Sequence, residues 1–121
     1  MPTDRSFTDV EIQISEFSRE RNWDKFHQPK NLILAAMGEL GELAEILQWK
    51  NDSEVINYLS TKDGRERIKE EIADVAIYLI RICQTQNIDF VEALAEKLQK
   101  NEINYPVEKS KDNASKYTEL N

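Results

Sequence analysis

Two stretches of the sequence have helical apolar periodicity, and each carries a pair of acidic residues on its apolar side. Because an α-helix turns by about 100° per residue, the direction of a side chain follows from its position. In the first stretch, Glu42 points about 60° away from Glu39, and Glu45 points about 120° away. The apolar residues within roughly 60° of Glu39 are Leu32, Ala35, Ala36, Leu43 and Ile46. Glu39 and Glu42 therefore belong to the apolar stripe, and Glu45 lies at its edge.

The second stretch repeats this arrangement with Glu71 and Asp74. Asp74 points about 60° away from Glu71, whereas Glu70 points about 100° away and is expected to face solvent. The apolar and aromatic residues within roughly 60° of Glu71 are Ile68, Val75, Tyr78 and Ile82. Residues 72–83 are apolar on nearly all sides, which predicts a buried helix.

Carboxylates on apolar faces need partners, because an unpaired charge is costly to bury. One explanation is a set of structural salt bridges, for which Arg67, Lys69 and Arg81 are the available cations. The favoured explanation is a metal site. Hard oxygen ligands at positions i and i+3 of two facing helices suit Mg²⁺, with Mn²⁺ as a substitute. Mg²⁺ in proteins is usually completed by substrate phosphates, so the site would accept a triphosphate together with its metal.

The fold predicted for the whole chain, residues 1–121, is a single all-α domain. Helices are expected over about 8–21, 29–49, 52–59, 63–86 and 89–106, with a polar tail from about 106. The expected capping residues are Thr8 with Glu11, Asp52 or Ser53, Asp63 with Glu66, and Asp89 with Glu92, while Pro29 suits a first helical turn. No stretch alternates with the period of two that strands require.

Composition excludes several classes of function. The single histidine and single cysteine, His27 and Cys83, rule out a multi-histidine zinc centre, a Cys/His metal site and a disulfide redox pair. The net charge of −7 disfavours binding to nucleic acid polymers. The sequence shows neither a secretory signal nor about 20 consecutive apolar residues, so we expect no membrane contact and a cytoplasmic protein.

Several motifs resemble the all-α, MazG-like nucleoside triphosphate pyrophosphatases. They are G-E-L-G-E-L-A-E at residues 38–45 and E-E-I-A-D-V at residues 70–75. Four further motifs resemble the dCTP pyrophosphatase branch: residues 21–31, Q-W-K at 48–50, Y-P-V at 105–107 and K-Y-T-E-L at 116–120. The similarity covers about residues 15–120, so it extends over nearly the whole chain.

The resemblance implies a helical bundle of about four to five helices that hydrolyses a nucleoside triphosphate to the monophosphate and pyrophosphate with Mg²⁺. It assigns metal binding to Glu39, Glu42, Glu71 and Asp74. Glu42 is the first choice for activating water and Glu45 the second. Many MazG-like proteins have two adjacent glutamates where this chain has Gly38 before Glu39, which leaves the number of metal ions open.

The same resemblance assigns substrate contacts to aromatic and polar residues. Trp23, His27 and Trp49 correspond to residues around the base, and Tyr78 is expected to contact substrate. Lys97, Asn101 and Tyr105 lie on one face of the last long helix, and the resemblance places them near the phosphates.

The expected substrate is dCTP, including 5-modified dCTP. The alternatives are a related pyrophosphatase acting on dUTP or damaged purine triphosphates, and a non-catalytic helical interaction module. The family assembles as dimers or dimers of dimers, and so small a chain leaves apolar faces to be covered by a second copy. We therefore expect a homotetramer, with a dimer as the alternative.

Overall fold

The computed structural model describes residues 5–120, in which every regular element is helical. This confirms the predicted all-α class. The elements in chain order are α1 (Phe7–Glu20), η1 (Asp24–Phe26), α2 (Pro29–Leu47), α3 (Asp52–Ser60), α4 (Lys62–Thr85), α5 (Phe90–Asn104), α6 (Val107–Ser110) and η2 (Tyr117–Glu119). The described residues form six α-helices instead of the expected four to five, because the polar tail contains the short helix α6.

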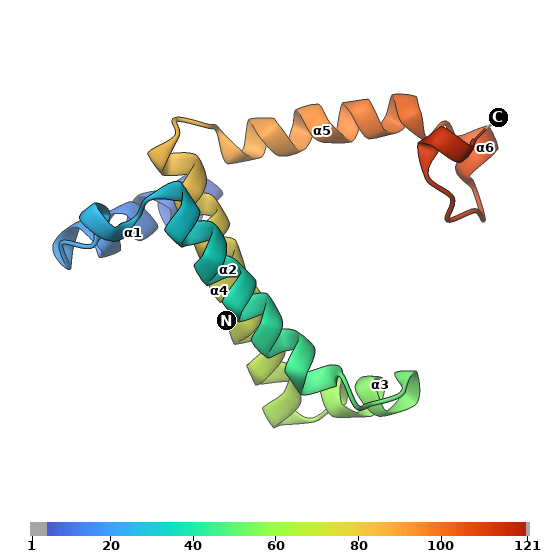
Figure 1. Ribbon diagram of the computed structural model, residues 1–121, viewed down its shortest axis with the longest axis horizontal. Helices are drawn as coiled ribbons and strands as arrows, with labels where there is room; N and C mark the ends of the chain where they lie inside the picture. Colours follow the sequence, from blue (N-terminus) through green and yellow to red (C-terminus); the bar gives the residue numbers. More distant parts are fainter. Residues whose placement is uncertain (1–4, 121) are drawn as a thin grey trace. The chain divides into compact units, whose positions relative to one another are not determined.

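The chain divides into two compact units, one ending at Asn87 and the other beginning at Ile88. In the first unit, α2 and α4 run antiparallel and side by side, and α1 and α3 pack against α4 (Figure 1). In the second unit, α5 leads into α6 and η2, where the rings of Tyr105 and Tyr117 meet edge to face with centroids 5.9 Å apart. The single-domain assignment of residues 1–121 stays a prediction.

Three capping residues lie one or two positions before the predicted ones, because in each case an earlier polar residue adopts the extended conformation of a cap. Ser6 and Asp9 form the first capping box in place of Thr8 and Glu11. Asn51, with Glu54, caps α3 in place of Asp52 or Ser53. The hydroxyl of Thr61 accepts from the Gly64 amide, so α4 starts before Asp63. Pro29 in the first turn of α2 and the Asp89 cap of α5 are confirmed.

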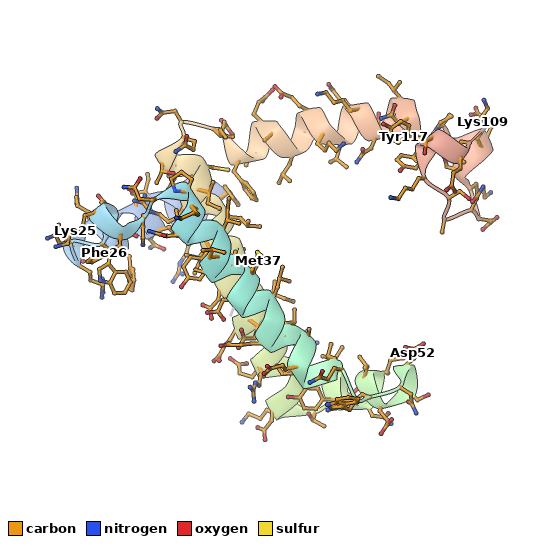
Figure 2. All side chains as sticks on the ribbon, in the orientation of Figure 1. Lys25, Phe26, Met37, Asp52, Lys109 and Tyr117 are labelled. Atoms are coloured by element: carbon orange, nitrogen blue, oxygen red, sulfur yellow. The ribbon has the colours of Figure 1, made fainter. Side chains whose placement is uncertain are left out.

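The prediction that residues 72–83 form a buried helix is wrong for the single chain. Within this stretch only Ile80 and Arg81 are buried, and Ile72 is 55% exposed. The reason is that α4 has neighbours on only part of its circumference. Along α2 a second row is also exposed, including Met37 at 61%, which is labelled in Figure 2. Both central helices therefore keep an apolar side that the other helices of the first unit do not cover.

None of the described helices has the length and apolar character needed to cross a membrane.

Candidate metal centre and aromatic cavity

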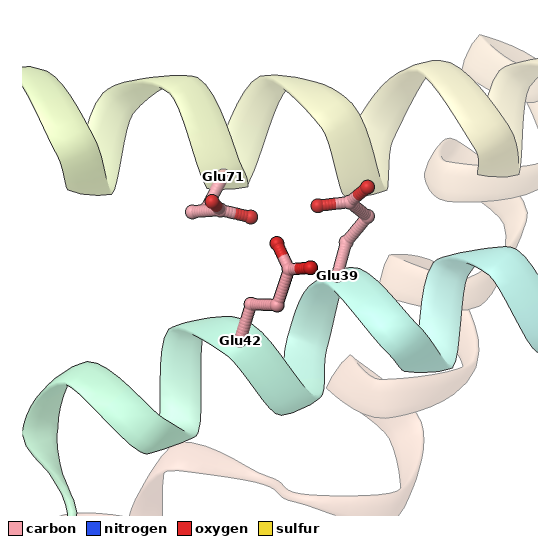
Figure 3. A group of neighbouring side chains, drawn as sticks. All are labelled: Glu39, Glu42 and Glu71. Atoms are coloured by element: carbon pink, nitrogen blue, oxygen red, sulfur yellow. The ribbon is translucent and has the colours of Figure 1, made fainter.

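Three of the predicted carboxylates converge between the two central helices. Glu39 and Glu42 come from α2 and Glu71 comes from α4, and Figure 3 shows their side chains pointing into the space between the ribbons. One oxygen from each residue lies within 4.8 Å of the others. The spacing of three residues places Glu39 and Glu42 on one side of α2, and the side-by-side packing of α4 brings Glu71 opposite them.

The neighbouring carboxylates change the ionisation of Glu39. The pKa of Glu39 is raised to about 7, first by a hydrogen bond with Glu71, then by burial and by the charges of Glu42, Asp74 and Glu71. Oxygen Oε2 of Glu71 is buried, and among the described residues it has no hydrogen-bond partner. An all-oxygen ligand set in which one acid has a raised pKa and another has a buried, unsatisfied oxygen fits a hard divalent cation such as Mg²⁺ or Mn²⁺.

The salt-bridge explanation of these acids is wrong for the part of the chain that the structure describes. Lys69 pairs with Glu66 at 3.4 Å, and Arg81 pairs with Asp24 at 2.9 Å. Neither cation, nor Arg67, forms an ion pair with the three carboxylates within residues 5–120. The group therefore carries unbalanced negative charge.

The other two predicted acids lie to either side of this group. Asp74, one turn along α4 from Glu71, raises the pKa of Glu39 by its charge and lines a large cavity. It is not among the three residues whose oxygens meet. Glu45 is exposed, and it lines a different, smaller pocket beyond Glu42.

The large cavity, of about 530 Å³, lies between α1 and α4 within the first unit. It brings together three of the predicted substrate residues, Trp23, His27 and Tyr78. Its full lining consists of Val10, Gln13, Ile14, Phe17, Ser18, Trp23, His27, Asp74, Ile77, Tyr78 and Arg81. Phe17 and Trp23 meet edge to face with ring centroids 5.6 Å apart, and Trp23 meets His27 at 6.4 Å. A cavity with several rings and a few polar groups suits a planar base.

Arg81 fixes the hydrogen-bonding state of His27. Its Nε donates to Nδ1 of His27 at 2.9 Å, so Nδ1 is an acceptor and the ring proton of a neutral imidazole lies on Nε2. The other guanidinium nitrogens donate to Gln84 at 3.0 Å and to Asp24 at 2.9 Å. Burial, followed by the charge of Arg81, lowers the pKa of His27. The lowered pKa favours the neutral imidazole of His27 at pH 7, with its N–H donor at Nε2.

The remaining predicted substrate residues do not line this cavity. Trp49 is 88% exposed and follows the C-terminal end of α2, whereas His27 precedes its N-terminal end. The intervening helix has 19 residues, which corresponds to roughly 28 Å. Lys97, Asn101 and Tyr105 belong to the second unit, on or directly after α5.

A family model described as the MazG-like family matches residues 35–120, which include the three clustered carboxylates. The chain belongs to the MazG-like family.

Relatives of this MazG-like chain include two mammalian proteins and one archaeal structure. The chain is 42% identical over 112 residues to dCTP pyrophosphatase 1 from Mus musculus and 40% identical to that from Homo sapiens. Each match covers 93% of this chain and 66% of the relative, so the chain spans just under two thirds of their length. A crystal structure of a pyrophosphatase from Archaeoglobus fulgidus aligns with a TM-score of 0.75 at 36% identity, covering 88% of this chain and 98% of that one.

Sequence reasoning missed Phe17 and Arg81 as parts of the cavity. The sequence analysis offered Arg81 only as a partner for the acids and gave Phe17 no role. The available signal was the position of Arg81 one turn after Tyr78 and Ile77, because Arg81 is the one charged residue of α4 after Asp74. Its contact with His27, 54 residues away, is a tertiary feature that no local pattern contains.

Proposed function

We propose that this MazG-like protein hydrolyses a nucleoside triphosphate, preferably dCTP or 5-modified dCTP, to the monophosphate and pyrophosphate with Mg²⁺. The observation that carries the proposal is the adjacency of the three-carboxylate group and the aromatic cavity. Asp74 links them, because it lines the cavity and acts by its charge on Glu39. The names of the mammalian relatives and of the archaeal structure support the reaction class.

The metal would be held by Glu39, Glu42 and Glu71, with Asp74 completing the set from the next turn of α4. When bound, Mg²⁺ supplies positive charge against the phosphates and acidifies water. Glu42 is the exposed member of the three, so its carboxylate is the first choice to accept the proton of the attacking water. Glu45, also exposed and one turn further along α2, is the second choice.

The base would enter the aromatic cavity against Trp23 and Phe17. His27 offers its Nε2 proton as a donor, because Arg81 occupies Nδ1. A donor fixed in this way suits a carbonyl or ring-nitrogen acceptor on the edge of a cytosine. Pockets that hydrogen-bond a polar edge reject bases that leave the donor unpaired. Tyr78 lines the cavity, and burial followed by the charges of Glu39 and Asp74 raises its pKa, so it would contact the sugar or the base.

Contacts from Trp49 to the base and from Lys97, Asn101 and Tyr105 to the phosphates are proposed from the family resemblance. Assembly into a homotetramer, or alternatively a dimer, is supported by the exposed apolar rows of α2 and α4. The side chains in these rows, each 41–61% exposed, are Ile33, Leu34, Met37, Leu40, Ile72, Ile77 and Leu79. A second copy would bury them.

The deciding experiment is product analysis with a panel of nucleotides and Mg²⁺. We expect dCTP to give dCMP and pyrophosphate fastest, and Glu42→Gln and Asp74→Asn each to reduce turnover at saturating Mg²⁺ by at least about 100-fold. Glu70→Gln, a neighbouring exposed acid, is the matched control and should retain activity. Diphosphate and phosphate as products would refute the mechanism. Turnover of no nucleotide would instead favour a helical interaction module, and equal rates with dUTP or purine triphosphates would refute the preference for cytosine.

A further inference from the structure

The aromatic cavity pairs the only histidine of the sequence with a buried arginine. Both His27 and Arg81 line the cavity, and Nε of Arg81 donates to Nδ1 of His27 at 2.9 Å. In the part of the chain that the structure describes, the other ring nitrogen of His27, Nε2, has no hydrogen-bond partner. One nitrogen of the imidazole is therefore occupied by the arginine, and the other is available to a ligand.

The chemistry of arginine imposes one state on the ring. A guanidinium has only donors and keeps its charge at every pH at which proteins are folded, so the nitrogen that faces it must be an acceptor. An amide or a hydroxyl at this place could donate or accept, and the ring could then turn over or move its proton to the other nitrogen. With Nδ1 of His27 accepting, the proton of the neutral ring is on Nε2. The contact with Arg81 therefore fixes the orientation and the tautomer of His27 together.

The two side chains are themselves held by neighbouring elements. Nη2 of Arg81 donates to Asp24 at 2.9 Å, and Nη1 donates to Oε1 of Gln84 at 3.0 Å. The amide nitrogen of Gln84 donates in turn to the carbonyl of Glu11 on α1 at 2.8 Å. The backbone N–H of His27 donates to the carbonyl of Asp24 at 3.1 Å. Contacts from α1, η1 and α4 thus hold both partners of the bond between Arg81 and His27.

We propose that Arg81 is a positioning residue that sets the preference for cytosine over uracil, because it makes Nε2–H of His27 a permanent donor to N3 of the base. The proposal rests on the proposed function and deepens it. In cytosine N3 carries a lone pair and accepts, whereas in uracil N3 carries a hydrogen and donates. The carbonyl at C2 is common to both bases, so only a contact with N3 distinguishes them. Arg81 acts through His27 and is not itself required to touch the base.

The size of the expected discrimination follows from the cost of unpaired donors. When uracil is bound, the N–H groups of His27 and of the base face each other, and neither has an acceptor. Leaving one buried donor unpaired lowers affinity by about tenfold to a hundredfold. Without Arg81, the ring of His27 can turn over or present a bare nitrogen to the N3–H of uracil, so this penalty is relieved. Loss of Arg81 should therefore narrow the preference for dCTP over dUTP.

The kinetic test measures kcat/KM for dCTP and for dUTP with Mg²⁺ and compares the ratio of the two between variants. We expect Arg81→Met to lower this ratio about tenfold or more, mainly through the KM values. Arg81→Lys keeps a charged donor and should retain more of the preference than Arg81→Met. Arg65→Met, which removes a charge from an exposed position of the same helix, should leave the ratio unchanged. When His27 is already replaced by alanine, Arg81→Met should have no further effect on the ratio.

A second measurement reads the state of the ring without any substrate. Because the sequence has one histidine, protein labelled with ¹⁵N-histidine gives the NMR signals of a single imidazole. We expect the wild type to carry its ring proton on Nε2 and none on Nδ1 at neutral pH. Arg81→Met should show exchange between the two tautomers, and Arg81→Lys should show less of it. If Arg81→Met does not fold, Arg81→Lys and the wild-type NMR signals still test the proposal.

The outcomes separate this inference from the proposed function. If Arg81→Met lowers kcat/KM for dCTP and dUTP by the same factor, Arg81 only supports the fold, and its role in specificity is overturned. A ring proton on Nδ1 of the wild type also overturns it, as does an effect of Arg81→Met that persists without His27. In an enzyme that releases dCMP and pyrophosphate, each of these results leaves the proposed function standing. Failure of the wild-type protein to cleave any triphosphate overturns the proposed function, and this inference with it.

Discussion

Replacing Arg81 by methionine tests whether the contacts of this side chain organise the aromatic cavity. The side chain of Arg81 is only 9% exposed and donates three hydrogen bonds. The bonds to His27 and Gln84 each contribute about 1–1.5 kcal/mol net, because the cost of burying the charged donor offsets part of their strength. The pair with Asp24, whose side chain is 56% exposed, contributes about 0–1 kcal/mol. Methionine keeps most of the apolar stem, so we expect the free energy of unfolding to fall by about 2–4 kcal/mol.

Urea unfolding followed by tryptophan fluorescence measures this loss. Arg65→Met, at an exposed position without a described side-chain contact, is the matched control and should change stability by less than about 0.5 kcal/mol. A loss for Arg81→Met no larger than for Arg65→Met would refute the reasoning, because the three bonds would then contribute nothing beyond an exposed side chain.

The same variant alters the pH dependence of stability. The pKa of His27 is lowered from 6.5 in the folded protein, so below pH 6.5 the unfolded chain binds more protons and folding becomes less favourable as the pH falls. Arg81 is the second cause of this lowering after burial, and Asp24 opposes it. We therefore expect Arg81→Met to lose less stability than the wild type between pH 6.5 and 5. An equal slope in both proteins would show that the charge of Arg81 does not act on His27.

Two further predictions concern the central helices. With the pKa of Glu39 at about 7, Mg²⁺ binding should release about half a proton from this group at pH 7 and about 0.9 at pH 6. Titration calorimetry in buffers of different ionisation heat measures this proton release. Glu39→Gln should abolish the release, and the control Glu70→Gln should keep it. If Glu39→Gln leaves the release unchanged, the proton does not come from Glu39. Gly64→Ala would place a methyl group against the Tyr58 carbonyl oxygen, at the N-terminal end of α4, and thermal unfolding should show a loss of about 1–3 kcal/mol. Gly41→Ala has open space and should be neutral or stabilising, and similar effects at both positions would show that the close approach is relieved at no cost.

The existence of the helices could be predicted from the sequence because periodicity is a local property. Their exact starts could not, since several polar residues compete for each cap. Ser6 and Thr8, or Thr61 and Asp63, are all acceptable cap residues, and the extended backbone of one of them decides which is used. Such differences of one or two residues move no functional side chain to another face.

Only part of the carboxylate site could be predicted from the sequence. Angular placement could show that Glu39 and Glu42 share a face of one helix and that Glu71 lies on the apolar face of another. It could not show which faces meet. In the structure, oxygens of Glu39, Glu42 and Glu71 lie close together, whereas Asp74, one turn further along α4, affects the pKa of Glu39 by its charge. The burial predicted for residues 72–83 failed because an apolar face indicates that a partner is needed, without saying that the same chain supplies it.

The exposed apolar rows and the clustered acids occur on the same two helices, α2 and α4. Cation binding at the acids would therefore affect the stability of this helix pair. The pKa of Glu39 is raised to about 7, so without a bound cation, raising the pH through about 7 removes the proton of Glu39 and increases repulsion between α2 and α4. Below the ordinary carboxyl pKa of 4.5 the proton stays bound, and this contribution to stability is fully present. A divalent cation held by these carboxylates would replace that proton, and by mass action it would stabilise the folded helix pair. Because the outer sides of these helices are the surfaces that a second copy would cover, metal binding should favour assembly as well as catalysis.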